Sequence, residues 1–407
     1  MNADSTFQVS SSSRILAVCL IALAAIIVVY GLLVDPGRTW PNLLLDGFYI
    51  ASLGVSALFF LAVQRVAGSR WSANLRRIPE AFLPVIPIAA VLLLLLYFGR
   101  HTLFPWIDPH LFDHAPSNAG KVRYLNPPWV FARMVFTVVV WTFFAWLFRR
   151  TSLQQDSNPS QSLVLHHRLS RYSVLFILAF ALTFTLGAYD WLLSLDPQWS
   201  STMFGFYEFA GTFVQGIAAI TLAVVFLKER GPLAKVVSQH QLHDLGKMVF
   251  AFSIFWAYIW TCQYLLIWYG NIPDEVTHFV KRTNGPWLYF FALNFILNWL
   301  IPFTVLLSIR AKCTPKLLKI ICVTVLVGHW LDLYILIMPA MWNKPTIGLY
   351  EIPIAAGYAA LVYLVFTREV ARAPIVPLND PVLAYETAQH ALWPELPHHI
   401  SPGASHD

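Results

Sequence analysis

The chain alternates long apolar segments with short polar ones. A helix crosses the hydrocarbon core of a bilayer with about 20 apolar residues, and ten segments approach this length. They cover residues 15–34, 43–66, 81–98, 128–148, 172–195, 204–227, 245–269, 287–309, 317–338 and 347–366. Because unpaired backbone groups are costly in lipid, spans of this length fold as helices. The pattern therefore predicts an all-α polytopic membrane protein with about ten transmembrane helices.

The composition agrees with lipid as the main solvent. Of the 407 residues, 57% are hydrophobic and 12% are charged, whereas soluble proteins carry about 25% charged residues. The net charge of +6 does not indicate nucleic-acid binding, because the basic residues form short clusters between the apolar segments. The first apolar segment is too long for a secretory signal peptide, so we expect it to remain as the first span.

The distribution of Lys and Arg predicts the orientation. With the N-terminus on the cytoplasmic side, 19 of the 27 basic residues lie on that side and 7 on the other, with Arg133 inside the fourth span. Cytoplasmic loops are enriched in Lys and Arg. We therefore expect both termini to be cytoplasmic, with a membrane domain at 1–370 and a Pro-rich cytoplasmic tail at 371–407. That tail is expected to lie on a partner or to be disordered.

Metal binding by this chain is not expected. The outer loop 99–126 holds His101, His110 and His114 with Asp108 and Asp113, but their spacing matches no standard metal site, so a docking surface or an ordinary loop is favoured. The four cysteines form no CxxC pair, which argues against iron–sulfur ligation. A membrane haem needs histidines from span interiors, and only His329 lies deep in a span.

Ionisable residues inside the spans are the main functional candidates, because burying them in lipid is costly. Most of them crowd the outer half of the membrane, which favours a polar cavity that exchanges protons with that side; the alternative is helix-end residues in headgroup water or residues paired for packing. His329 and Asp332, spaced i,i+3, share a helix face, and a carboxylate beside an imidazole favours a proton acceptor. Arg133 is equally suited to be a counter-ion or a ligand-binding group. The candidates are Asp46, Arg133, Asp190, Glu208, His329 and Asp332, with Asp244 and Lys247 at the cytoplasmic entrance of the seventh span.

Several longer motifs resemble a known family. They are GAYDWLLSLDPQWSSTMFG at 187–205, HDLGK at 243–247, FWAYIW at 255–260 and QYLLIWYGNIPDE at 263–275. These segments are similar to the F-type membrane subunits of alternative complex III, within the NrfD/polysulfide-reductase-like family. The similarity is strongest between residues 179 and 298, while the first three spans match only in their pattern.

The resemblance implies a fold and a context. The fold is two four-helix bundles with flanking helices, and the context is a quinol:cytochrome c or related oxidoreductase of the bacterial inner membrane. Expected partners are a homologous NrfD-like subunit, an iron–sulfur/molybdopterin-like subunit, haem c subunits and a terminal oxidase. The chain itself would bind no redox cofactor and would supply a quinone pocket, a proton pathway or both, with quinol as substrate.

The resemblance also implies site residues. By position in the motifs these are Asp190, Glu208, His243, Asp244, Lys247, Gln263 and Tyr264, whereas Asp46, His329 and Asp332 are candidates from the residue pattern alone. We expect His329, Asp332, Asp190 and Glu208 to line one cavity open to the periplasm. Two other functions stay open: a proton-coupled secondary transporter, for which interrupted spans in matched halves are not evident, and a structural scaffold without a quinone site.

Overall fold

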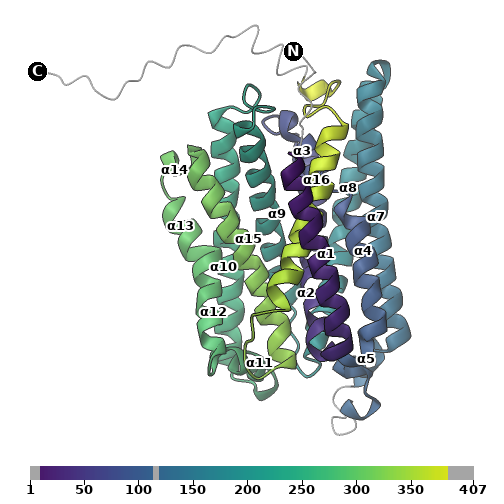
Figure 1. Ribbon diagram of the computed structural model, residues 1–407, viewed down its shortest axis with the longest axis vertical. Helices are drawn as coiled ribbons and strands as arrows, with labels where there is room; N and C mark the ends of the chain where they lie inside the picture. Colours follow the sequence, from purple (N-terminus) through teal and green to yellow (C-terminus); the bar gives the residue numbers. More distant parts are fainter. Residues whose placement is uncertain (1–9, 113–118, 384–407) are drawn as a thin grey trace, which may run out of the picture.

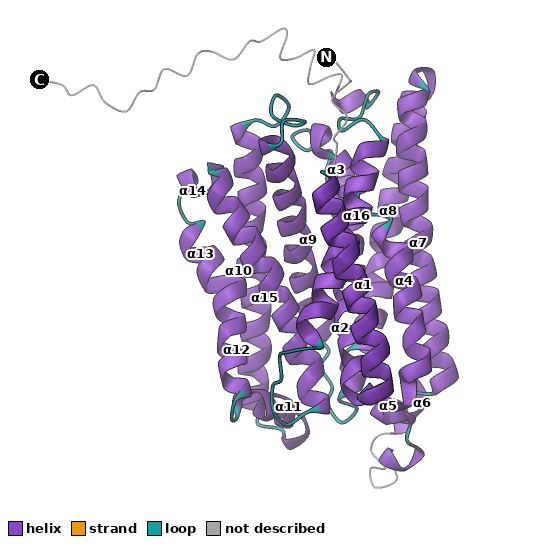
Figure 2. Ribbon diagram, viewed as in Figure 1, coloured by secondary structure: helices purple, strands orange, loops and turns teal. Residues whose placement is uncertain are grey.

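The computed structural model describes residues 10–112 and 119–383. Within these residues ten helices are long and apolar enough to cross a membrane, which confirms the predicted fold class. Figure 2 shows the helices joined by loops. The spans are α1 (Ser11–Val34), α2 (Pro36–Val66), the irregular span Ala73–Leu103, α7 (Pro127–Ser157), α8 (Ser162–Trp191), α9 (Phe204–Glu229), α10 (Gln239–Gly270), the irregular span Trp287–Val305, α15 (Pro315–Met341) and α16 (Glu351–Arg372).

Several helices extend beyond the apolar segments that predict them. Helix α2 begins at Pro36 instead of near residue 43, and α7 ends at Ser157 instead of near residue 148. The extra turns are polar, and local caps satisfy their backbone. Asp35 accepts a hydrogen bond from the Arg38 amide at 3.2 Å, and Pro36 supplies the first turn of α2 without needing a donor partner. Hydropathy marks the lipid-embedded part of a helix, whereas capping decides where the helix ends.

The spans form two four-helix bundles with two flanking helices, as expected. One bundle contains α2, α4 (Val85–Leu95), α7 and α8, and the other contains α9, α10, α15 and the pair α12 (Trp287–Phe295) and α13 (Ile301–Val305). Helices α2 and α9 join the bundles and are the most enclosed, with 83% and 89% of their most apolar windows buried. Helices α1 and α16 pack side by side against α2 (Figure 1). Gly357 of α16 lies so close to Ala24 of α1 that a side chain at 357 has no room, as is common where membrane helices approach closely.

Two spans are not continuous α-helices, although the sequence shows no evident interruption there. The third span is broken between α3 (Arg77–Glu80) and α4 and ends in 3-10 and short helical turns. In the eighth span, a π-helical segment, Ile296–Leu300, separates α12 from α13. Pro302 has no amide hydrogen to donate to the carbonyl four residues earlier, which accounts for the local change in hydrogen bonding. Such π segments often mark functional positions.

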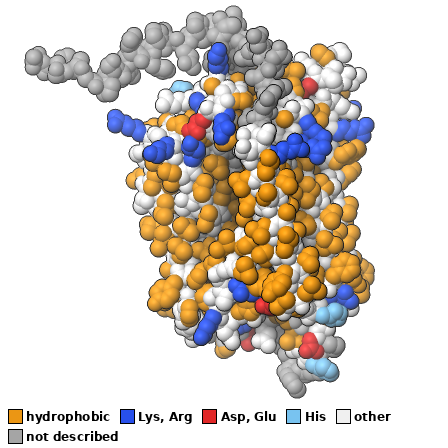
Figure 3. Space-filling model, in the orientation of Figure 1, with side chains coloured by type: hydrophobic (Ala, Val, Ile, Leu, Met, Phe, Trp, Pro, Cys, Tyr) orange, Lys and Arg blue, Asp and Glu red, His pale blue; other side chains and the backbone are white. Residues whose placement is uncertain are grey.

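The two ends of the bundle differ. We call the end where α1 begins and α16 ends the terminal end, and the opposite one the α11 end. Helix α11 (Pro273–Thr283) is short and amphipathic and lies at the α11 end, at the bottom of Figure 1. Figure 3 shows a belt of hydrophobic side chains between these ends, with Lys and Arg gathered at both edges of the belt. Exposed Leu178, Leu182 and Tyr289 belong to the apolar surface that faces lipid in a membrane.

The first part of the segment after α16 packs against its own chain. Residues 373–383 pack against the loops of the same chain at the terminal end, where Asp380 is 2% exposed. The Asn379 side chain donates to the Asp156 carbonyl oxygen at 2.7 Å. Polar groups of the chain itself thus order residues 373–383, while binding of the tail to a partner stays a prediction. Residues 384–407 lie outside the described part of the chain.

Candidate functional site

Asp332 is the centre of a buried polar cluster. This carboxylate of α15 is 2% exposed and accepts hydrogen bonds from three neighbouring helices. The Tyr207 hydroxyl of α9 donates to Oδ1, as does Asn294 Nδ2 of α12 at 2.6 Å, and Trp256 Nε1 of α10 donates to Oδ2 at 3.1 Å. The second bundle is therefore organised around one carboxylate whose oxygens are held by oriented donors.

The π-helical segment of the eighth span supports this cluster. Asn298, inside the segment, donates from Nδ2 to Asn294 Oδ1 at 2.6 Å and to the Asn294 carbonyl at 3.1 Å. Because the Asn294 oxygen is engaged in this way, its amide nitrogen is directed at Asp332. Two asparagines four residues apart in an apolar span are the signal that sequence reasoning could have used and missed.

His329 lies beside Asp332 without a hydrogen bond to it. Its Nδ1 is 3.9 Å from Asp332 Oδ2, and neither ring nitrogen has a hydrogen-bond partner among the described residues, although the side chain is fully buried. The shared helix face is confirmed, but the two groups are separated by more than hydrogen-bonding distance. Gly211 of α9 makes room for the imidazole, because a Cβ there would lie 2.7 Å from the ring.

Two further buried carboxylates, one on α9 and one on α2, each have an oxygen without a hydrogen-bond partner among the described residues. Glu208 follows Tyr207 on α9, is 1% exposed, and has only Thr212 Oγ1, at 3.5 Å, as a donor. Its Oε2 has no partner among the described residues. Asp46 of α2 accepts a hydrogen bond from Trp330 Nε1 through Oδ1 at 2.8 Å. Its Oδ2 has no hydrogen-bond partner among the described residues. Such orphaned buried oxygens indicate sites for water or for a proton.

Asp190 does not join this cluster. Arg133 of α7 donates to both of its oxygens, from Nε at 2.9 Å and from Nη2 at 2.7 Å, inside the first bundle. The guanidinium also lies over the Tyr124 ring, 3.9 Å from the ring centroid. The structure thus supports the counter-ion interpretation of Arg133, and it pairs Asp190 with Arg133 instead of placing it beside Asp332.

A cavity connects Asp332 with the α11 end. It is narrow, with a volume of about 20 Å³, which is enough for a water molecule. Its walls come from the second bundle and from α11, and α11 covers it. The lining residues are Trp199, Tyr207, Trp260, Gln263, His278, Phe279, Arg282, Phe291, Asn294, Asp332, Ile335 and Leu336.

The rim of this cavity carries a polar group that the sequence analysis did not single out. His278 of α11 stacks on Trp199 with ring centroids 3.5 Å apart, and its Nδ1 is 3.3 Å from Asp196 Oδ2. Arg282 Nε donates to the Ile335 carbonyl at 2.9 Å, which is free because Pro339 four residues later has no amide hydrogen. The sequence did contain a signal for this group: His278 and Arg282 are spaced i,i+4, which places them on one face of an amphipathic helix.

Burial and neighbouring charges set the protonation of this rim. Burial, together with the charge of Arg282, lowers the pKa of His278 to about 3, so the imidazole is neutral near pH 7. Burial also lowers the pKa of Arg282 to about 10, which leaves it cationic. Although burial opposes it, the hydrogen bond to His278 and the charges of Lys281 and Arg282 hold the pKa of Asp196 below its usual value. The rim therefore presents a carboxylate, a neutral imidazole and a guanidinium.

A second, wider groove lies next to the cavity. It is largely open, with a volume of about 380 Å³, and lies between the end of α8, the segment 200–203, α10 and α11. Gln263 lines both the groove and the cavity, and its Nε2 donates to Ser201 Oγ at 3.0 Å. Leu266, 66% exposed, continues the groove toward the lipid-facing surface. Gln263 is therefore the side chain that separates an apolar lateral groove from the Asp332 cavity.

The remaining motif residues lie elsewhere. Tyr264 belongs to an aromatic group, with Trp260, Phe279 and Phe291 within 6.1 Å between ring centroids. His243, Asp244 and Lys247 lie in the first turns of α10 at the terminal end, and the exposed Lys247 pairs with Asp244 at 2.6 Å. They are thus at the other end of α10 from Gln263 and form no part of the Asp332 site.

The described residues contain no group of three or more His, Cys, Asp or Glu side chains placed to hold a metal ion. Of the outer loop, His101 and His110 are exposed, while Asp113 and His114 lie outside the described residues. In comparisons with known proteins, no family model matches the chain and no curated protein is significantly similar to it.

Proposed function

We propose that this chain is a membrane subunit of a quinol oxidoreductase of the alternative complex III type, in which it moves protons released by quinol oxidation. The observation that carries the proposal is the Asp332 carboxylate, held by three donors under a cavity that leads to the α11 end. The motif resemblance supports the class of complex. Iron–sulfur, haem c and homologous membrane subunits would carry the electrons, with a terminal oxidase as a further partner.

The chemistry requires a proton path separate from the electron path. Oxidation of one quinol releases two electrons and two protons, and the electrons pass to redox centres in the partner subunits. Asp332 takes up a proton as a carboxylate and releases it as a carboxylic acid into the cavity. Water in the cavity then passes the proton toward Asp196 at the rim. With the α11 end facing the periplasm, as the Lys and Arg distribution favours, the protons leave on the outer side.

The lateral groove suits the substrate class of this proposal. A quinol has an apolar tail and a polar ring, and the groove combines apolar Leu193, Leu266 and Ile267 with the polar Ser201 and Gln263. The ring hydroxyls would meet Gln263, one side chain away from the Asp332 cavity. The homologous partner subunit would offer the alternative quinol site, in which case this chain contributes the proton path alone.

Replacement of Asp332 by asparagine tests the proposal in the assembled complex. The Asp332→Asn side chain nearly keeps the shape but cannot exchange a proton, so we expect quinol turnover and proton release to fall at least ~10-fold with assembly intact. Glu208→Gln should slow turnover in the same direction. A matched control is Glu229→Gln, an exposed carboxylate at the terminal end paired with Lys319. Wild-type rates for both buried variants across about pH 5 to 9 would refute the proton path.

A proton-coupled secondary transporter is the second candidate. The interrupted eighth span beside a buried carboxylate favours it, because transporters often form their sites at broken helices. Purification in mild detergent separates the two functions. Co-purification with haem c and iron–sulfur subunits supports the complex, whereas isolation of the chain alone with proton-coupled uptake in vesicles supports the transporter. A scaffold would assemble normally and tolerate every substitution in the Asp332 cluster.

A further inference from the structure

A second cluster of buried charges lies at the terminal end, far from the Asp332 cavity. Arg65 lies in the last turn of α2 and is 7% exposed, and Arg76 lies between the 3-10 turn Ala73–Leu75 and α3 and is 3% exposed. Asp380, from the segment that follows α16, is 2% exposed and pairs with Arg76 Nη1. His166 Nδ1 of α8 is 3.7 Å from the other oxygen of Asp380. The Arg76 guanidinium and the His166 imidazole thus lie against one carboxylate, and the charge of Arg65 acts on the same carboxylate without a direct ion pair.

We call the place that Asp380 occupies beside Arg65, Arg76 and His166 the seat. Its two arginines have hydrogen-bond donors without a partner. Arg65 Nε and Nη1 and Arg76 Nε have no partner among the described residues, although all three atoms are buried. Asp380 accepts one hydrogen bond from Arg76 and one from the Val382 amide. A planar carboxylate therefore leaves much of the donor set of the two arginines unsatisfied. A tetrahedral phosphate, with more acceptor oxygens, suits such a donor set better.

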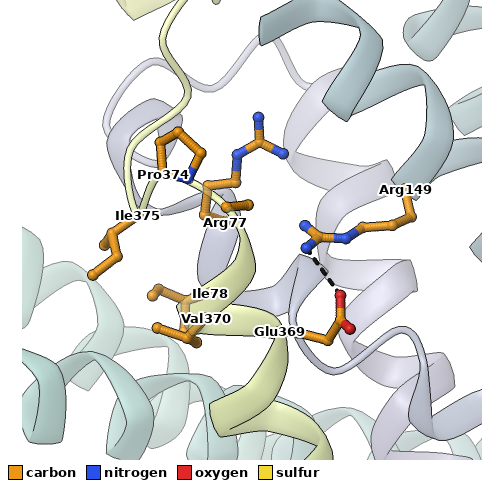
Figure 4. Close-up of a pocket in the computed structure, with 8 residues that line it drawn as sticks. Arg77, Ile78, Arg149, Glu369, Val370, Pro374 and Ile375 are labelled. Carbon is orange, nitrogen blue, oxygen red and sulfur yellow. Dashed lines mark hydrogen bonds and ion pairs between the residues drawn. The ribbon is translucent and has the colours of Figure 1, made fainter. Parts of the chain in front are cut away.

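The neighbouring charges are already paired. Arg77 donates to Glu80 at 2.7 Å and also binds Asp156. Arg149 binds Glu369 at 3.0 Å, and Figure 4 shows this pair next to Arg77, with the segment after α16 passing beside them. Asp380 is thus the carboxylate paired with Arg76, and its charge acts on Arg65 together with that of Glu80. Removing it would leave the buried Arg76 without its counter-ion, which is strongly destabilising.

The segment that carries Asp380 is bound in the manner of a peptide ligand. Asn379 Nδ2 donates to the carbonyls of Gln155 and Asp156, at 3.3 and 2.7 Å, and the Leu378 amide donates to Asp156 Oδ1 at 3.1 Å. These polar contacts place the carboxylate in the seat from a segment without a long helix. Burial opposes ionisation, but the charges of Arg76 and Arg65 hold the pKa of Asp380 below its usual value.

We propose that Arg65, Arg76 and His166 form an anion-binding site that the chain fills with its own Asp380, and that a phosphate group takes the same seat when this carboxylate is absent or displaced. The ligand class is a phosphate oxyanion, either as free phosphate or as the phosphodiester of an anionic lipid at the membrane surface. The segment 373–383 then acts as an intramolecular competitor for this ligand. This inference is independent of the proposed function.

Chemical rescue tests the site. The complete protein is prepared with Asp380→Asn in nanodiscs of phosphatidylcholine, and its thermal-unfolding midpoint is compared with that of the wild type with and without ~10 mM inorganic phosphate. We expect a lower midpoint for Asp380→Asn in neutral lipid, and phosphate to restore it by about 3 °C or more. The wild type, whose seat is occupied, should respond by less than ~1 °C. A second arm replaces phosphate with ~20% phosphatidylglycerol and shows whether a lipid headgroup reaches the seat.

The double variant Arg76→Gln/Asp380→Asn keeps the experiment informative. It removes one cation with its counter-ion, so it should unfold at a higher temperature than Asp380→Asn and lose the response to phosphate. Stabilisation by phosphatidylglycerol identifies a lipid ligand, and stabilisation by phosphate alone identifies the free ion; both support the site. Equal phosphate responses in all three proteins, or no response of Asp380→Asn to either phosphate or phosphatidylglycerol, would overturn the proposal.

Discussion

At the scale of single residues, partners decide what each buried charge does. Asp190 and Asp332 are both buried carboxylates in spans, but Asp190 is paired with Arg133, whereas Asp332 is held by neutral donors only. An ion pair is a stable structural element, while a carboxylate among neutral donors can change its protonation without losing a counter-ion. The two residues look alike in the sequence because both are acidic residues in an apolar segment.

The space beside His329 provides a residue-scale prediction. Gly211→Ala would place a Cβ 2.7 Å from the imidazole, so the ring must shift within the cluster. We expect a loss of stability of about 1–3 kcal/mol, measured as a lower thermal-unfolding midpoint of the purified protein. The control is Gly270→Ala at the end of α10, where nothing lies within 4 Å of the added Cβ. Equal midpoints for the two variants would show that His329 is loosely packed.

At the scale of elements, irregular segments position the site. The π segment Ile296–Leu300 presents Asn298 to Asn294, and α11 closes the cavity with His278 and Arg282. Neither feature follows from hydropathy, because the mean hydropathy of the eighth span is high despite its two asparagines and α11 is too short to span. The functional groups concentrate where regular helix geometry is interrupted, as is common near sites.

Helix α11 provides a prediction about pH. The pKa of His278 is about 3 in the folded protein, through burial and Arg282, against about 6.5 when unfolded. Because the imidazole pKa is lower in the folded state, the unfolded state binds the proton at a higher pH than the folded state does. The free energy of unfolding therefore decreases as the pH falls below about 6.5. Between pH 7.5 and 5 this group costs on the order of 2 kcal/mol. His278→Gln should therefore lose less stability than the wild type over this range, as measured by thermal-unfolding midpoints at each pH. Identical pH slopes would contradict the assignment.

At the scale of the whole molecule, the two bundles keep two polar regions apart. The Asp332 cavity opens at the α11 end, and the Arg65–Asp380 seat lies at the terminal end, where α2 finishes and α16 ends. The apolar belt visible in Figure 3 lies between these ends. One end thus suits proton exchange and the other suits recognition of an anion at the opposite surface of the membrane.

Orientation gives the whole-molecule prediction. The bias of 19 basic residues against 7 predicts that the terminal end faces the cytoplasm. A reporter that is active only in the cytoplasm should therefore be active when it is fused after Asp407. A reporter that is active only in the periplasm should be active when it is inserted near Ser200, in the loop before α9. Fusion after Asp407 leaves the Asp380 contacts in place. The opposite pattern of reporter activity would reverse the sides assigned to both sites.

The sequence by itself determined the spans and the fold class, and it placed Asp332, His329 and Glu208 inside the membrane. Lipid demands long apolar helices and makes buried charges conspicuous, so hydropathy reads both directly. Only the tertiary structure decided which charges meet. It paired Asp190 with Arg133, separated His243, Asp244 and Lys247 from Gln263, and brought Asp380 to Arg76 across 304 positions. Such contacts depend on helix rotation, interruptions and loop packing, which the period of apolar residues along one helix does not encode.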